Sequence, residues 1–124
     1  MHLTTSGNAD IYGARIPGLW FTPSPGGNTN AIHFANAVSG NRNYYFNSPR
    51  VPLKKWAHLR LMQTLEGGKY IYRVFLNGAK LKEVVNSKPQ DFHNVKLFVG
   101  DPWYPAQPGY IKNLHIHNGP VPGK

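Results

Sequence analysis

The sequence predicts an all-β fold, an antiparallel β-sandwich of about eight short strands. Runs in which apolar and polar residues alternate recur along the chain, as expected of half-buried strands. Turn-forming residues separate these runs about every ten residues. The 124 residues include 13 glycines and 11 prolines. Almost no segment has helical periodicity. The length suits one compact domain that spans residues 1–124.

The first half of the chain contains short apolar runs separated by turns. The first run, residues 14–21, contains Pro17. This predicts a place at a sheet edge or in a bulge, because proline donates no ladder hydrogen bond. The segments "PSPGGNTN" (23–30) and "SGNRN" (39–43) predict turns, and "SPRVPLKK" (48–55) is a connection broken by proline. The predicted strands are "ARIPGLWF" (14–21), "AIHFANAV" (31–38) and "YYFN" (44–47).

The second half contains the strongest strand signals. In "WAHLRLMQTL" (56–65) and "KYIYRVFLN" (69–77) apolar residues alternate with others, so Tyr72 and Val74 share a face opposite Arg73. A Gly-containing turn joins these two runs, and the Asn-Gly pair at 77–78 supplies a second tight turn. Further predicted strands are "LKEVV" (81–85), "NVKLFVG" (94–100) and "YIKNLHIH" (110–117).

The charge is the strongest compositional signal. Lys plus Arg number 14 against 5 acidic residues, a formal net charge of +9. Such a field attracts polyanions, namely nucleic acids, sulfated glycans, acidic lipid surfaces or mineral. The alternative is that the lysines only solvate the sheets and protect their edges. The densest cluster is Lys80, Lys82 and Lys88, and the polyanion donors to test are Arg42, Arg50, Lys54, Lys55, Arg60, Arg73, Lys80, Lys82 and Lys88.

Three features are missing from the sequence. Cysteine is absent, which excludes disulfides and thiolate metal sites. No run of about 18 apolar residues occurs, so no helical membrane span is predicted. The start, "MHLTTSGNAD", has neither the basic nor the apolar region of a signal peptide.

The loop "GDPWYPAQPG" (100–109) contains candidate glycan-binding residues. Trp103 and Tyr104 could stack on sugar rings, while Asp101 and Gln107 could bond hydroxyl groups. The structural alternative is that the three prolines fix a chain reversal and that Trp103 plugs one end of the sandwich.

Two motifs carry a resemblance to a known family. The stretches "YGARIPGLWF" (12–21) and "NVKLFVGDPWYPAQPGYIKNL" (94–114) occur in this order. Together with the strand pair at 56–77, the chain resembles the laminin G-like, concanavalin A-like sandwich superfamily, and most closely modules of extracellular proteins of marine invertebrates. The resemblance implies a jelly-roll sandwich and an extracellular location.

The chain departs from that family in two places. Ala14 stands where relatives usually have an acidic residue, and similar domains have further strands before "HLTTSGN". We therefore expect a truncated or redesigned form of the domain. Its unpaired strands would be covered by a partner chain, by a second copy, or by closure of the remaining strands.

The resemblance also implies calcium, which laminin G-like domains often bind. The candidate ligands are Asp10 and Asp101, but so few acidic residues predict weak binding or none. His115 and His117 lie on one face of a predicted strand, where they could begin a zinc or copper site. A third ligand would have to come from His58, His33 or His93, and a solvated strand face is the alternative.

Nucleic acid binding and catalysis are the less favoured functions. Basic and aromatic residues mix between 69 and 80, but Tyr72 and Arg73 point to opposite faces. Glycanases of this fold class need two carboxylates across a cleft, and no suitably spaced acidic pair occurs. The sequence thus predicts a non-catalytic extracellular module that binds glycans or acidic matrix polysaccharides and needs no cofactor. The alternative is a structural or self-assembling domain that pairs with another chain through exposed strand edges.

Overall fold

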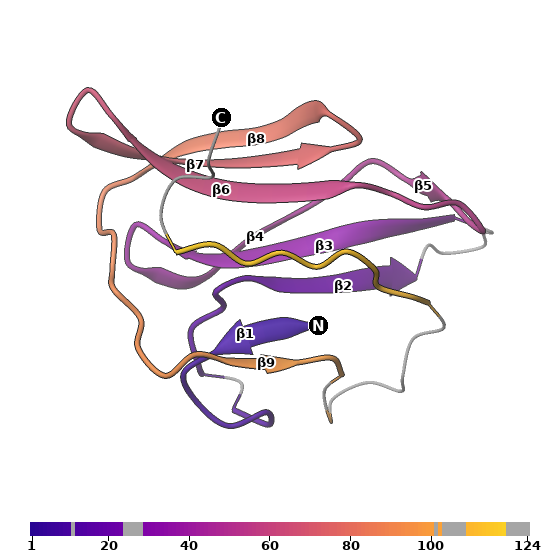
Figure 1. Cartoon of the computed structure of the whole chain (residues 1–124), viewed down its shortest axis with the longest axis horizontal. Coiled ribbons are helices and arrows are strands. Elements are labelled where there is room, and N and C mark those ends of the chain that lie inside the picture. Colours follow the sequence, from indigo (N-terminus) through magenta and orange to yellow (C-terminus); the bar gives the residue numbers. More distant parts are fainter. Residues whose placement is uncertain (11, 24–28, 101, 103–108, 119–124) are drawn as a thin grey trace.

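Two antiparallel sheets form the molecule (Figure 1). The computed structural model describes residues 1–10, 12–23, 29–100, 102 and 109–118, and these residues form nine strands. The predicted all-β sandwich is confirmed. The described residues contain no helix, and thus no helix that could cross a membrane.

The larger sheet, sheet A, follows the order β4-β3-β2-β1-β9, and β5 also pairs with β3. Every pairing in it is antiparallel. Its strands are β1 (His2–Thr4), β2 (Gly18–Pro23), β3 (Thr29–Val38), β4 (Asn41–Asn47), β5 (Val51–Pro52) and β9 (Lys96–Phe98).

The smaller sheet, sheet B, is a meander of β6 (Leu59–Glu66), β7 (Lys69–Leu76) and β8 (Ala79–Asn86). Two-residue turns join these strands. Gly67 and Gly68 have φ of 55° and 76°, and Asn77 and Gly78 have 50° and 81°. Positive φ at both central residues is the geometry whose twist matches a hairpin, so both predicted tight turns are confirmed.

The core lies between the two sheets. Phe34 on β3 is fully buried and stacks on Phe46 of β4, with ring centroids 5.1 Å apart. From sheet B, Tyr72 and Val74 face it at 2% and 0% exposure. Burying one such large apolar side chain stabilises the fold by about 1.5–3 kcal/mol. The predicted alternation of β7 is therefore confirmed.

A row of rings crosses the outer face of sheet A from one edge to the other. Successive ring centroids are 5.4, 6.0, 5.9 and 5.2 Å apart. Offset ring contacts at these distances add to the stability of a sheet face. The row consists of Phe98, His2, Trp20, His33 and Tyr45.

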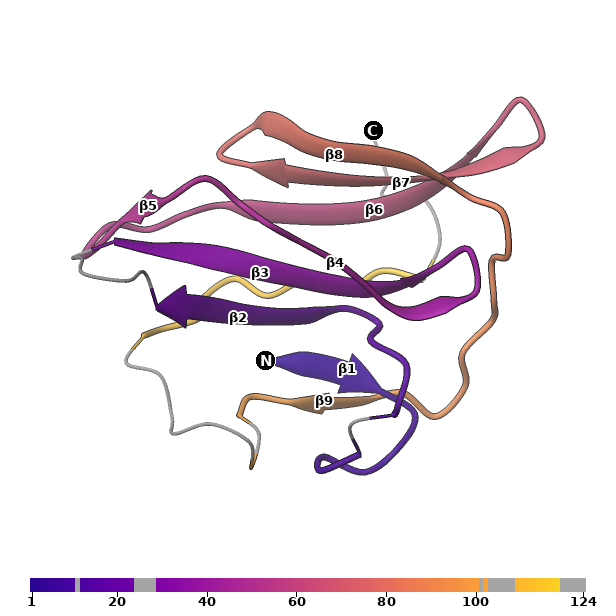
Figure 2. The same ribbon diagram turned by 180° about the vertical axis from the view of Figure 1, so that it is seen from behind.

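The last described segment, 109–118, runs in the layer of sheet B although it is not a strand. Figure 1 shows it (yellow) in front of β3, and Figure 2 shows it behind β3, so it lies on the side of sheet A that faces β6. The sequence predicts a strand over 110–117, but the structure has none there: the segment is unpaired among the described residues and bends at Asn113, where φ is 52°.

Candidate functional site

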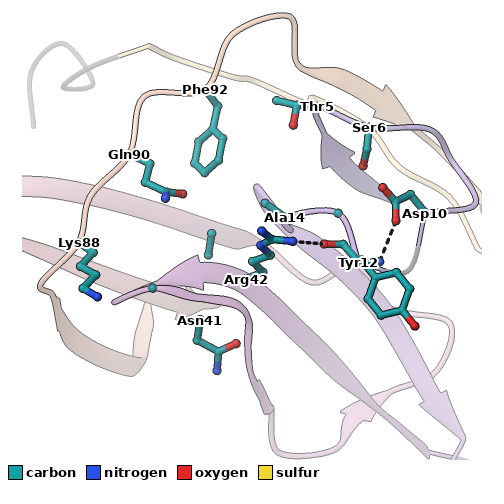
Figure 3. Close-up of a pocket in the computed structure, with 13 residues that line it drawn as sticks. Thr5, Ser6, Asp10, Tyr12, Ala14, Asn41, Arg42, Lys88, Gln90 and Phe92 are labelled. Carbon is teal, nitrogen blue, oxygen red and sulfur yellow. Dashed lines mark hydrogen bonds between the residues drawn. The ribbon is translucent and has the colours of Figure 1, made fainter.

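A pocket of about 480 Å³ opens at one end of the sandwich (Figure 3). Three segments far apart in the sequence build it: the loop after β1, the turn between β3 and β4, and the connection that follows β8. Its lining includes Asp10, Tyr12, Arg42, Lys88, Gln90 and Phe92.

Hydrogen bonds from both side chains and backbone fix the loop after β1 against β4. The Tyr12 N–H donates to Oδ1 of Asp10 at 2.9 Å, which closes a local turn. The Arg42 guanidinium donates to the carbonyl of Tyr12 at 3.3 Å, and the Arg15 N–H donates to the carbonyl of Arg42 at 3.1 Å. The loop is thus held by its own residues and by β4.

Asn86, at the end of β8, joins the other two walls. Its buried amide oxygen accepts hydrogen bonds from the N–H of Ser39 at 2.7 Å and from that of Lys88 at 3.2 Å. The Lys88 stem lies against Gly40, where an added Cβ would come within 3.1 Å of Lys88 Cδ. A glycine with φ of 83° therefore serves both the turn and the placement of Lys88.

The pocket carries more positive than negative charge. Arg42 and Lys88 both line it, and neither forms an ion pair with a carboxylate of any described residue. Asp10 is the one acidic side chain among the described lining residues. Two cations that no described carboxylate neutralises favour an anionic ligand.

The remaining lining groups suit a sugar. The exposed ring of Tyr12 and the half-buried ring of Phe92 offer apolar faces, and Gln90 adds an amide. Apolar rings beside a few hydrogen-bonding groups are common in ligand sites. In Figure 3 Arg42 lies in the middle of the pocket. Lys88 is on one side of it, and Tyr12 and Asp10 are on the other side.

The cations that the sequence proposed as polyanion donors lie in different surroundings. Arg73 pairs with Glu66 at 2.7 Å and with Glu83 at 2.6 Å, and Lys80 pairs with Glu83 at 2.9 Å. The hydrogen bond from Arg73, and then that from Lys80, hold the pKa of Glu83 below its ordinary value. These two cations are therefore partly neutralised within the chain.

The other seven proposed donors are not in ion pairs with described residues. Lys82 reaches over Tyr44 and Phe46, with its Nζ 5.8 and 5.5 Å from their ring centroids. Arg60 is half-buried on β6. Of the nine proposed donors, Arg42 and Lys88 are the two among the described lining residues of the pocket.

The structure does not test the predicted glycan-binding loop. Asp101, Trp103, Tyr104 and Gln107 lie outside the described residues. For calcium this leaves Asp10, whose carboxylate already accepts the Tyr12 N–H.

The histidine pair lies outside the pocket, on the segment 109–118. The rings of His115 and His117 stack with centroids 6.3 Å apart, and both residues are exposed. No cluster of three or more potential ligands occurs among the described residues.

Sequence reasoning missed the roles of Tyr12, Gln90 and Phe92. Tyr12 belongs to the motif "YGARIPGLWF" (12–21), which carries the family resemblance but indicates no role for Tyr12. Gln90 and Phe92 lie in a connection without regular structure, and no sequence signal marks them.

No family model matches the chain, and searches of curated proteins and of solved structures find no match either. The chemistry of the site therefore has to come from its own geometry.

Proposed function

We propose that the protein is a non-catalytic binding module, extracellular as the family resemblance implies, that holds an acidic glycan in the pocket of Arg42 and Lys88. The observation that carries the proposal is the pair of cations that no described carboxylate neutralises, set in a pocket with exposed rings. One acidic group of the glycan would bond to Arg42 and another to Lys88, and a sugar ring would stack on Tyr12.

Binding is favoured over hydrolysis because of the acidic residues. Hydrolysis of a glycosidic bond generally needs two carboxyl groups on opposite sides of the bond. Among the described lining residues Asp10 alone is acidic, and its Oδ1 accepts the Tyr12 N–H. Asp10 therefore suits a role in accepting a sugar hydroxyl.

A comparison of two double variants with the same net charge tests this proposal. Arg42→Gln with Lys88→Gln removes the pocket cations, and Lys55→Gln with Lys69→Gln removes two exposed cations elsewhere. Each charge-assisted hydrogen bond contributes about 1.5–3 kcal/mol, so the pocket variant should bind heparin oligosaccharides at least about tenfold more weakly. Isothermal titration at fixed salt measures this.

The control variant should lose about twofold or less, because it changes only the diffuse field. Equal losses in the two double variants would show that the charge acts without a site, and the pocket would then not be the binding site.

A further inference from the structure

The segment 109–118 has no backbone partners among the described residues, and it bends at Asn113, where φ is 52°. Among the described residues it makes no backbone hydrogen bond and belongs to no sheet. Its apolar side chains face solvent: Tyr110 is 89% exposed, Ile111 51% and Ile116 60%. Extended backbone with unpaired N–H and C=O groups is a template for strand pairing.

This segment lies beside a second open edge, that of β6. Sheet B has the order β6-β7-β8, so β6 pairs on one side only among the described residues. Figures 1 and 2 place the segment 109–118 on that open side, and Lys112 Nζ lies 4.2 Å from the ring centroid of Trp56, just before β6. Among the described residues, β6 and the segment 109–118 thus lie side by side in one layer, and each has an edge without backbone partners.

Phe21 lies on the inner face of β2, near the start of this segment. It shares that face with Leu19, which packs against the core, and it is 39% exposed. A Cβ added to Gly109 would be 3.5 Å from the Phe21 ring, so the segment begins close to sheet A.

A pocket of about 240 Å³ opens between the sheets beside β6, and it shares Gln90 and Phe92 with the first pocket. It is lined by Leu61 and Gln63 of β6, by Tyr72 of β7 and by Asn36 of β3. The Tyr72 hydroxyl is buried, yet it makes no hydrogen bond to any described residue. Leaving a buried hydroxyl unbonded is costly, so a ligand group that bonds it would be favoured.

The state of this hydroxyl sets the chemistry of that group. Burial raises the pKa of Tyr72 far above its ordinary value, and the nearby Asn36 amide lowers it by less without reaching hydrogen-bond geometry. The phenol therefore keeps its proton and offers it to an oxygen of an amide or a carboxyl group.

Charge selects the partner. The two open edges contribute Arg60 and Lys112, whereas their one acidic residue, Glu66, is bonded to Arg73. A second copy would bring another +9 to this region. An acidic chain is the complement of such a surface.

We propose that β6 and the segment 109–118 accept between them one extended strand of an acidic partner chain, with an oxygen-bearing side chain of that strand bonded to the Tyr72 hydroxyl. Strand addition of this kind takes its affinity from main-chain hydrogen bonds and its specificity from pockets for alternate side chains. The proposal goes beyond glycan binding, since it uses neither Arg42 nor Lys88.

The probe is a set of nine-residue peptides that alternate valine and glutamate, in which asparagine replaces each valine in turn. Fluorescence anisotropy measures binding, and amide hydrogen exchange locates it. We expect one asparagine position to bind best and to slow exchange in 59–66 and 110–117. The same peptides with lysine in place of glutamate should bind at least about tenfold more weakly.

Tyr72→Phe tests the pocket, because it removes only a hydroxyl that bonds no described residue and so leaves the fold intact. It should weaken binding of the best asparagine peptide about fivefold and leave the all-valine peptide unchanged. Tyr70→Phe, on the same strand and exposed, should change neither.

Absence of binding, equal binding of the lysine peptides, or protection elsewhere would each overturn the proposal. A concentration-dependent dimer that protects the same amides would replace the acidic partner with a second copy. An unchanged asparagine preference in Tyr72→Phe would remove Tyr72 from the contact.

Discussion

Arg73 lies on the outer face of sheet B, where its guanidinium reaches both neighbouring strands. It bonds Glu66 and Thr64 of β6 and Glu83 of β8. Cross-strand pairs of opposite charge stabilise a sheet modestly, and exposed ion pairs contribute little each. Arg73 is therefore a structural residue first, and its capacity to bind a polyanion competes with two carboxylates.

Arg73→Gln should change how the stability depends on pH. Glu83 has a lowered pKa in the folded state, so its stabilising effect is present above its ordinary pKa of 4.5 and is lost as the pH falls through the lowered value. The difference in unfolding temperature between the two proteins should be largest at neutral pH and shrink in acid. Calorimetry from pH 7 to pH 3 measures it.

The matched control is Arg60→Gln on the neighbouring strand, where no ion pair with a described residue exists. Its effect on the unfolding temperature should not depend on pH in this range. A carboxyl resonance of Glu83 that titrates at its ordinary pKa in the unmodified protein would contradict the assignment.

At this scale the sequence predicted the faces of residues but not their partners. The alternation of β7 placed Tyr72 and Arg73 on opposite faces, and in the structure Tyr72 is inside and Arg73 outside. The partners Glu66 and Glu83 depend on the registers of β6 and β8 with β7, and these registers are set by packing that no local pattern shows.

Among the elements, the hairpin between β7 and β8 depends most directly on local chemistry. Asn77 and Gly78 both have positive φ. The Asn77 side chain also accepts the N–H of His58 at 2.8 Å, and the Asn77 N–H donates to the carbonyl of His58 at 2.8 Å. The turn thus joins two strands and also holds the entry to β6.

Gly78→Ala should destabilise the protein by about 1 kcal/mol. Nothing lies within 4 Å of a Cβ added at this glycine, so the cost comes from its φ of 81° alone. Urea unfolding followed by fluorescence measures the change. Gly7→Ala is the control, because its Cβ is also in open space and it has no positive φ; it should stay within about 0.5 kcal/mol. Equal effects at both glycines would contradict the turn argument.

The elements that the sequence missed are those made by distant partners. β1 has three residues, too few for an alternation to be visible, and β2 and β9 pair with it on either side. In contrast, 110–117 has the pattern of a strand but no partner among the described residues. The pattern predicted a strand over 110–117 and none at β1, whereas pairing depends on what lies beside each segment.

For the whole molecule, the strand pattern predicted the class of fold, and the counts of charged residues determine the sign of the net charge. Alternation and spacing were enough for a sandwich, since few other architectures use many short strands. The pocket of Arg42 and Lys88 could not be predicted, because three loops separated by tens of residues build it. A site of this kind becomes visible only when the topology is known.

The net charge of +9 should make stability depend on ionic strength. Like charges on one small domain repel each other and oppose the compact state, and salt shortens the range of that repulsion from about 30 Å at 0.01 M to about 8 Å at 0.15 M. Added sodium chloride should therefore raise the unfolding temperature at pH 7. Lys69→Glu, which lowers the charge by two at an exposed site, should raise the temperature in low salt and reduce its response to salt. An unfolding temperature that falls with salt would mean that the ion pairs of Arg73 outweigh the repulsion, since screening weakens both.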